Sequence, residues 1–238
     1  MDRTIFITGS SRGIGASIAR QAKSEGYEVI LHGRTASESL VLLSEELKSS
    51  YLTFDVTEEK QVKEAMSSIN ILNVLINSAG VNLSRPFMEL STDDWQQVYA
   101  VNVFGLAGVI RTAIPSLLRV GSPSRIVNIA SVKGLYSSVG RAAYASSKAA
   151  VINLTTALAK ELAPRILVNA VAPGFVNTEM THNTMSERIQ QQVDSILLGR
   201  IAQPLEVAHA ALFLAHERNS YITGQTLNVD GGFSIKHE

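Results

Sequence analysis

The chain has 238 residues, of which 45% are hydrophobic, so it is long and apolar enough to bury a sizeable core. Lysine plus arginine and aspartate plus glutamate both number 21, a balance that gives no overall attraction to nucleic acid or to an anionic membrane. The absence of cysteine excludes disulfides, thiolate chemistry and cysteine metal sites. The apolar run from Ile5 to Ile7 is far too short for a secretory or membrane segment, and we expect a cytoplasmic protein.

Short β-branched runs alternate with stretches of helical spacing along the whole chain. Because parallel neighbouring strands need a crossover, which is usually a helix, this alternation predicts an α/β fold. We expect a single-domain doubly wound parallel sheet (Rossmann fold) over residues 1–238, with about seven strands and helices on both faces. The expected strands are residues 4–7, 28–31, 51–54, 74–76, 125–129, 166–171 and 226–229.

A glycine-rich loop, T-G-S-S-R-G-I-G at residues 8–15, follows the first expected strand and opens the first expected helix. Glycines at such a turn let the backbone approach a pyrophosphate, whose charge is favoured by the helix amino terminus. The spacing of Gly9, Gly13 and Gly15 is G-x-x-x-G-x-G, so three glycines alone are also compatible with an ordinary tight turn. The place of the loop between strand and helix favours dinucleotide binding.

The end of the second expected strand indicates which dinucleotide binds. An acidic side chain there would hold the ribose hydroxyls of NAD, whereas an arginine would accept the 2'-phosphate of NADP. The sequence has Arg34 and no acid at this point, and Arg12 offers a second cation from the glycine loop. Guanidinium groups pair well with phosphate, so we predict NADP(H), the alternative being two solvated surface charges.

Y-A-S-S-K at residues 144–148 places a tyrosine and a lysine four residues apart, on one face of a helix. A nearby cation stabilises a phenolate, so Lys148 could turn Tyr144 into a usable proton donor at neutral pH. Taken alone, the pair is more often an ordinary amphipathic surface. The five histidines form no ligand cluster, and we predict no metal site.

Two further segments carry expectations. A substrate lid is expected at about 175–203, just past the carboxyl end of the sixth strand. The helical stretches at 93–110 and 142–162 are apolar almost all round, which is typical of helices that are buried or shared between subunits.

These motifs together resemble the short-chain dehydrogenase/reductase family. The glycine loop, N-S-A-G at 77–80, Ser131, Y-A-S-S-K and the pair Pro173 and Gly174 fall in the family's order and spacing over essentially the whole chain. Within the family the chain is most similar to the 3-oxoacyl-[acyl-carrier-protein] reductases, through V-A-P-G-F-V-N-T-E-M-T at 171–181 and Y-I-T-G-Q-T-L-N-V-D-G-G at 221–232.

The resemblance implies a catalytic tetrad of Asn102, Ser131, Tyr144 and Lys148, with Ser131, Arg141 and Tyr144 facing the substrate. Arg141 departs from the glutamine often found there, and Ser78 departs from the usual N-N-A-G. From the loop, the arginines and the resemblance we expect cofactor contacts from Gly9, Ser11, Arg12, Gly13, Ile14, Gly15, Arg34, Asp55, Val56, Asn77, Ala79, Gly80, Tyr144, Lys148, Pro173, Gly174, Val176 and Thr178.

The implied activity is NADPH-dependent reduction of a 3-oxoacyl thioester, carried by acyl carrier protein, to the 3-hydroxyacyl product in fatty acid synthesis. The resemblance also implies a homotetramer and places Arg125 and Arg165 where similar reductases dock the acidic carrier protein. Two alternatives stay open: a reductase of another ketone, and a catalytically silent NADP-binding protein.

Overall fold

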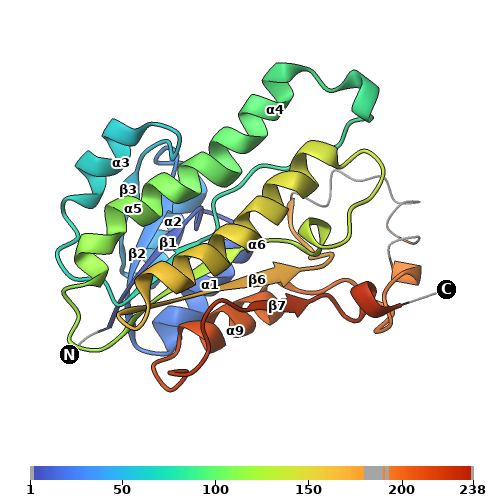
Figure 1. Ribbon diagram of the computed structural model, residues 1–238. Coiled ribbons are helices and arrows are strands. Elements are labelled where there is room, and N and C mark those ends of the chain that lie inside the picture. The colour runs from blue at the N-terminus through green and yellow to red at the C-terminus, as the bar shows by residue number, and fades with distance from the viewer. Residues whose placement is uncertain (1–2, 180–189, 191–192, 237–238) are drawn as a thin grey trace.

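The computed structural model describes residues 3–179, 190 and 193–236. Within them, seven parallel strands form one sheet in the order β3-β2-β1-β4-β5-β6-β7 (Figure 1). The predicted Rossmann fold is therefore confirmed, and each strand lies within two residues of its predicted position. The strands are β1 (Arg3–Thr8), β2 (Tyr27–Gly33), β3 (Ser50–Thr53), β4 (Val74–Asn77), β5 (Ser124–Ile129), β6 (Ile166–Pro173) and β7 (Thr226–Val229).

Helices cover both faces of the sheet. The α-helices are α1 (Gly13–Ser24), α2 (Glu38–Leu47), α3 (Glu59–Met66), α4 (Thr92–Tyr99), α5 (Leu106–Leu117), α6 (Ala142–Leu162) and α9 (Pro204–Ala215). Short helical turns are η1 (Phe87–Glu89), η2 (Ala100–Gly105), η3 (Val132–Gly134) and η4 (Phe233–Ile235). Buried side chains of α1, α2 and α9 form one hydrophobic cluster, and those of α3, α5 and α6 form another on the opposite face. Figure 1 shows α5 and α6 on one side of the sheet and α9 on the other.

The strand order reverses at β1, which pairs with β2 on one side and β4 on the other. Register aligns the carboxyl ends here, with Thr8 beside Asn77 and Asn77 beside Asn128. In open α/β sheets, ligands bind outside the carboxyl ends at such a switch point. The loops that follow β1, β4 and β5 carry the glycine loop, N-S-A-G and Ser131, so the fold brings these motifs to one edge.

The helices α4 and α5 form one continuous run, because η2 between them is a π-helical turn. The run Thr92–Leu117 is the one described helix with the length and hydropathy needed to cross a membrane. A core helix meets the same test, and Val109 and Ala113 of this run are fully buried against the sheet. A π-turn inside an α-helix is frequent at functional sites, and this one carries Asn102.

Candidate active site

The glycine loop packs tightly against the segment after β4. Gly9 has φ +63°, and a Cβ there would lie 2.7 Å from Ala79 Cα, so glycine alone fits. A Cβ at Gly15 would lie 2.4 Å from the Gly9 carbonyl oxygen. The Thr8 hydroxyl accepts the amides of Ser78 and Ala79 at 3.0 and 3.1 Å. The loop, the start of α1 and N-S-A-G therefore form one close-packed unit.

The amino terminus of α1 is open to an anion. Its capping residue, Arg12, makes no side-chain cap, and the first turn contains no acid. The first amides of a helix lack intrahelical partners and attract negative charge, and Arg12 does not cap them with its side chain. The residues present thus fit the pyrophosphate of a dinucleotide, with Gly13, Ile14 and Gly15 supplying the helix start.

The two arginines predicted to read the 2'-phosphate differ in their surroundings. Arg34 follows β2, is exposed and has no carboxylate partner in the described part of the chain. Arg12 Nη1 lies 3.1 Å from Glu179 Oε2, and both side chains are about 70% exposed. Asp55 and Val56, predicted beside the adenine, follow β3 next to this edge.

Ser131, Tyr144 and Lys148 are brought together by the contact between η3 and α6. A Cβ at Gly134 would lie 2.7 Å from the backbone carbon of Lys148, so the turn touches the helix backbone to backbone. The Ser131 hydroxyl accepts the Lys133 amide at 3.1 Å and forms a hydrogen bond with the Tyr144 side chain. The Lys148 ammonium donates to the Ile129 carbonyl at 2.8 Å and lies 5.9 Å from the centre of the Tyr144 ring.

Asn102 joins the same cluster from the π-helical turn, with only 1% of its surface exposed. Its amide accepts the Val81 N–H and donates to the Val81 carbonyl, both at 2.9 Å, and donates to the Ser147 hydroxyl at 3.0 Å. A Cβ at Gly80 would lie 3.2 Å from Asn102 Oδ1 and 3.6 Å from Lys148 Nζ. Gly80 therefore lies directly beside both the asparagine and the lysine.

Burial shifts the pKa values of both titratable groups. It raises the pKa of Tyr144, while the hydrogen bond with Ser131 and the charge of Arg141 act in the lowering direction. Burial lowers the pKa of Lys148 to about 8, which leaves its ammonium mostly charged at neutral pH. The sequence predicts that Lys148 lowers the pKa of Tyr144. In the structure burial is the larger influence and that pKa stays raised, while the lysine ammonium donates to the Ile129 carbonyl.

The residues predicted after β6 approach the glycine loop. Pro173 ends the strand, and a Cβ at Gly174 would lie 2.8 Å from Asp230 Cα. The Thr178 methyl lies 3.5 Å from the position of a Cβ at Gly13, which places this threonine over the start of α1. Val176 forms a parallel bridge with Ala202, so the two ends of the expected lid are tied together. Residues 180–189 and 191–192 of that lid lie outside the described residues.

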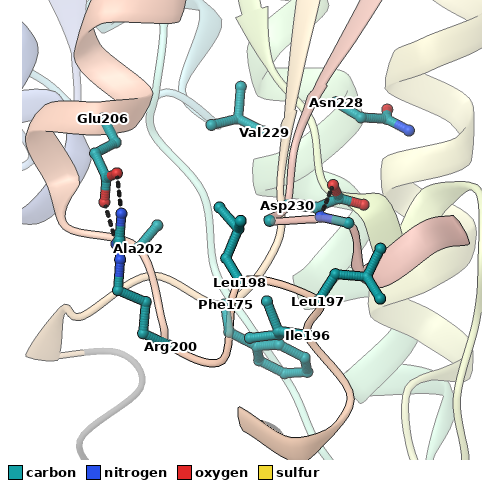
Figure 2. Close-up of a pocket in the computed structure, with 12 residues that line it drawn as sticks. Phe175, Ile196, Leu197, Leu198, Arg200, Ala202, Glu206, Asn228, Val229 and Asp230 are labelled. Atoms are coloured by element: carbon teal, nitrogen blue, oxygen red, sulfur yellow. Dashed lines mark hydrogen bonds and ion pairs between the residues drawn. The ribbon is translucent and has the colours of Figure 1, made fainter. Parts of the chain in front are cut away.

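Two cavities adjoin the site without containing the tetrad. One, of about 430 Å³, is lined mainly by Phe175, Ile196 and Leu198 and by residues at the end of β7 (Figure 2). Figure 2 shows the ion pair of Arg200 with Glu206, 2.7 Å long, at its side. The other, of about 440 Å³, lies beside the start of α1 and next to Thr178 and Glu179.

Sequence reasoning missed Lys133, two residues after Ser131. Its ammonium lies 5.2 Å from the ring centre of Phe175 and 4.6 Å from that of Phe233. Burial and the nearby charge of Arg141 lower its pKa. Arg141 itself donates to Asn82 Oδ1 at 2.6 Å. Arg141 therefore acts on both Lys133 and Tyr144. The signal for Lys133 in the sequence was its place on the turn that carries the serine.

The prediction that Arg125 docks a carrier protein is wrong. Its side chain is 6% exposed and donates to the carbonyls of Pro123 and Glu217 at 2.5 and 2.8 Å, so it cannot serve as a surface contact. Arg165 is exposed and donates to the Leu118 carbonyl at 2.8 Å. Both arginines lie at the amino ends of their strands, across the sheet from the tetrad of the same chain.

Comparisons with known proteins agree with this geometry. Residues 9–234 match a family model described as enoyl-(acyl carrier protein) reductase. The 3-oxoacyl-[acyl-carrier-protein] reductase FabG of Aquifex aeolicus is 40% identical over 239 residues, covering 95% of both chains. The chain belongs to the short-chain dehydrogenase/reductase family. It is therefore an oxidoreductase that acts on a CH–OH or C=O group with a nicotinamide cofactor.

Solved structures extend the comparison to other members of the short-chain dehydrogenase/reductase family. A 3-oxoacyl-[acyl-carrier protein] reductase from Brucella melitensis is 31% identical with a TM-score of 0.92, covering 98% of this chain and 92% of that one. A putative gluconate dehydrogenase from Agrobacterium tumefaciens is 29% identical with a TM-score of 0.94, covering 99% and 97%. Among the described residues, no group of three His, Asp or Glu is placed to hold a metal ion.

Proposed function

We propose that this protein reduces a 3-oxoacyl thioester, carried by acyl carrier protein, to the 3-hydroxyacyl product in fatty acid synthesis, using NADPH. The observation that carries the proposal is the convergence of Asn102, Ser131, Tyr144 and Lys148 beside Gly80, next to a loop that fits a pyrophosphate. The similarity to 3-oxoacyl-[acyl-carrier-protein] reductases along nearly the full chain supports this substrate.

The proposed roles follow from the positions of the side chains. The nicotinamide supplies the hydride. Tyr144 donates its hydroxyl proton to the carbonyl oxygen, and Ser131, already hydrogen-bonded to it, donates to the developing alkoxide. Lys148 would hold the nicotinamide ribose, and its positive charge would stabilise the phenolate that Tyr144 leaves after giving up its proton. Asn102 retains a water between the lysine and solvent.

The choice of NADP(H) over NAD(H) is part of the proposal. Arg34 stands exposed at the end of β2 without a carboxylate partner in the described residues, and no acid replaces it. A bidentate guanidinium favours a phosphate over the two hydroxyls of an unmodified ribose. Arg12 supports the same choice, although it shares its charge with Glu179.

We further propose that residues 1–238 act as one domain with a lid over 175–203, in a cytoplasmic homotetramer built through α4, α5 and α6. Phe104, on the turn between α4 and α5, is 67% exposed, as an interface residue would be in an isolated subunit. Arg165 remains a candidate contact for the carrier protein, since its side chain is on the surface.

A second candidate is a reductase of a ketone that carries a carboxylate or phosphate. The charge of Arg141 acts on both Tyr144 and Lys133, and Lys133 lies on the turn that carries Ser131. An anionic group on the substrate would pair with these two cations, whereas a neutral 3-oxoacyl chain would not. The solved structure of a putative gluconate dehydrogenase with this fold supports such a substrate.

NADPH oxidation separates the candidates. Acetoacetyl-acyl carrier protein, acetoacetyl-coenzyme A and free acetoacetate are compared at equal concentration, with wild type and Tyr144→Phe. The first proposal expects kcat/KM to be highest for the carrier-linked thioester. A higher kcat/KM for acetoacetate, reduced by Lys133→Met, favours the second. No turnover of any ketone, with NADPH still bound, favours a silent binding protein.

A further inference from the structure

The glycine loop is held in place by a buried histidine that has no part in the chemistry above. We propose that His32 is a positioning residue of the cofactor site: its neutral ring, with the proton on Nε2, fixes the backbone of Gly9 in the conformation that receives the dinucleotide phosphates. This inference rests on the nicotinamide dinucleotide of the family and is independent of the choice between NADP and NAD.

The two ring nitrogens have partners that define the tautomer. Nδ1 lies 3.0 Å from the Gly9 amide nitrogen, which can only donate, so Nδ1 must be the acceptor. Nε2 lies 3.0 Å from the Phe54 carbonyl oxygen, which can only accept, so Nε2 must carry the proton. With 2% of its surface exposed, the side chain has no competing water. Each nitrogen therefore has one role.

The backbone of the same residue also holds the loop. The Ser10 amide donates to the His32 carbonyl at 2.9 Å, and the His32 amide donates to the Ser10 hydroxyl at 2.8 Å. The Ser10 hydroxyl also donates to the His32 carbonyl at 3.4 Å, so Gly9 and Ser10 are tied to β2 through four hydrogen bonds with one residue. These bonds span about twenty residues of sequence and replace the strand pairing that ends at Phe6 and Ile30.

The position of Gly9 matters for the cofactor because the rest of the loop is built against it. Gly9 takes the left-handed conformation, and its carbonyl oxygen leaves no room for a Cβ on Gly15, at the start of α1. A shift of Gly9 would therefore move the helix start that receives the pyrophosphate. Phe54, at the other end of the ring, directly precedes Asp55 and Val56, which are proposed to contact the adenine. His32 lies between the phosphate and adenine ends of the site.

The surroundings of the ring favour the neutral form. The ring centres of Phe54 and Phe6 lie 4.1 and 6.1 Å away, and burial among them lowers the pKa of the imidazole more than the charge of Asp55 raises it. A proton on Nδ1 would place a donor against the Gly9 N–H, which is also a donor. The loop geometry described here thus requires an unprotonated Nδ1.

Two substitutions separate the hydrogen bonds of the ring. In His32→Asn, the amide oxygen occupies the place of Nδ1 and can accept from Gly9, but the bond to Phe54 is lost. In His32→Gln, the terminal amide reaches the place of Nε2 and can donate to Phe54, but the bond to Gly9 is lost. Each variant loses one buried neutral hydrogen bond, so they serve as controls for each other.

The dissociation constants of NADPH and NADH are measured by fluorescence titration, beside the Tm of the cofactor-free protein. We expect His32→Gln to weaken both cofactors by about tenfold and His32→Asn by less than about threefold, with similar losses of Tm. Both cofactors shift together because the loop contacts the pyrophosphate that they share. A loss of affinity confined to NADPH would overturn the proposal, because it would concern Arg34 and the 2'-phosphate and not the shared pyrophosphate.

The proposal is overturned if His32→Gln binds as tightly as wild type, or if the loss of affinity in the two variants follows their loss of Tm. Nitrogen-15 NMR of the wild-type protein measures the tautomer of His32 directly and needs no substitution. We expect a protonated Nε2 and an unprotonated Nδ1 at pH 7. The opposite tautomer would overturn the proposal even if neither variant folds.

Discussion

Arg12 of the glycine loop and Glu179 at the base of the lid form an ion pair, with Nη1 3.1 Å from Oε2. Both side chains are largely exposed, so the pair contributes little to stability. Its importance lies in its place, since Arg12 is one of the two cations proposed to bind the 2'-phosphate. In the protein without cofactor, Glu179 already neutralises part of the charge of Arg12.

We expect Glu179→Gln to lower the dissociation constant of NADPH by about two- to fivefold, because a free guanidinium attracts the phosphate more strongly. NADH lacks that phosphate and should bind as in wild type. Titration at low and high salt checks the effect, which should diminish as ionic strength rises. Glu161→Gln, at an exposed acid outside the described ion pairs, is the control. An equal gain for both cofactors would contradict the prediction.

Arg34→Ala tests the other cation. We expect the dissociation constant of NADPH to rise by about 10- to 100-fold, because a charge-assisted bidentate contact is lost, while that of NADH changes by less than about twofold. Isothermal titration with both cofactors measures the difference. Lys23→Ala, at a partly exposed cation in the last turn of α1, should leave both constants unchanged. Equal weakening of the two cofactors would remove Arg34 from the 2'-phosphate site.

Tyr144→Phe removes the proposed proton donor. Because general acid catalysis contributes about 10²- to 10⁴-fold, we expect kcat/KM to fall by at least about 10³-fold while NADPH binding stays within about twofold. Steady-state kinetics and cofactor titration measure the two quantities separately. Tyr136→Phe, at an exposed tyrosine shortly after η3, should retain full activity. Retained turnover in Tyr144→Phe would assign the proton transfer to another group.

Lys148 should give the activity an alkaline limit. Burial lowers its pKa to about 8 in the free protein, so its ammonium is lost as the pH rises through that value. We expect kcat/KM for ketone reduction to decline above pH about 8, since kcat/KM reports groups of the free enzyme. Lys148→Met should be weakly active without this decline. A wild-type profile that stays level to pH about 9.5 would contradict the assignment.

His32 should make the fold sensitive to acid. Burial lowers its pKa from 6.5 to about 4, so the unfolded chain binds a proton that the folded chain refuses between these values. The contribution of neutral His32 to the free energy of unfolding, about 3 kcal/mol, is therefore complete above pH about 6.5 and is lost as the pH falls to about 4. Urea unfolding across this window measures it. The carboxylates titrate in both proteins, so His32→Asn should also lose some stability over this range. It should lose less than wild type, because it has no imidazole to protonate.

Local motifs explain how much of this molecule could be predicted. The strands, the glycine loop and the spacing of Tyr144 and Lys148 depend on short stretches of sequence, and they reach one edge of the sheet because parallel strands align their carboxyl ends. The absence of an acid at the end of the second expected strand also identified Arg34 as the candidate ligand of the 2'-phosphate. Each of these features requires only neighbours along the chain or the general rules of the fold.

The rest depends on contacts between distant segments. Arg12 and Glu179 are 167 residues apart, and no local pattern pairs them. The rings that flank Lys133 come from the loop after β6 and from η4, so its surroundings appear only in three dimensions. Arginine is usually a surface residue, yet the side chain of Arg125 is buried and its two terminal nitrogens donate to the carbonyls of Pro123 and Glu217.

The contact between Gly134 and the backbone of Lys148 has a consequence for how such an enzyme diversifies. Since main chain meets main chain there, the spacing of the serine from the tyrosine and lysine does not depend on any exchangeable side chain. Lys133 and Arg141, by contrast, meet their neighbours through their side chains. Substitution of either should therefore alter substrate preference while the proposed proton-transfer residues keep their spacing.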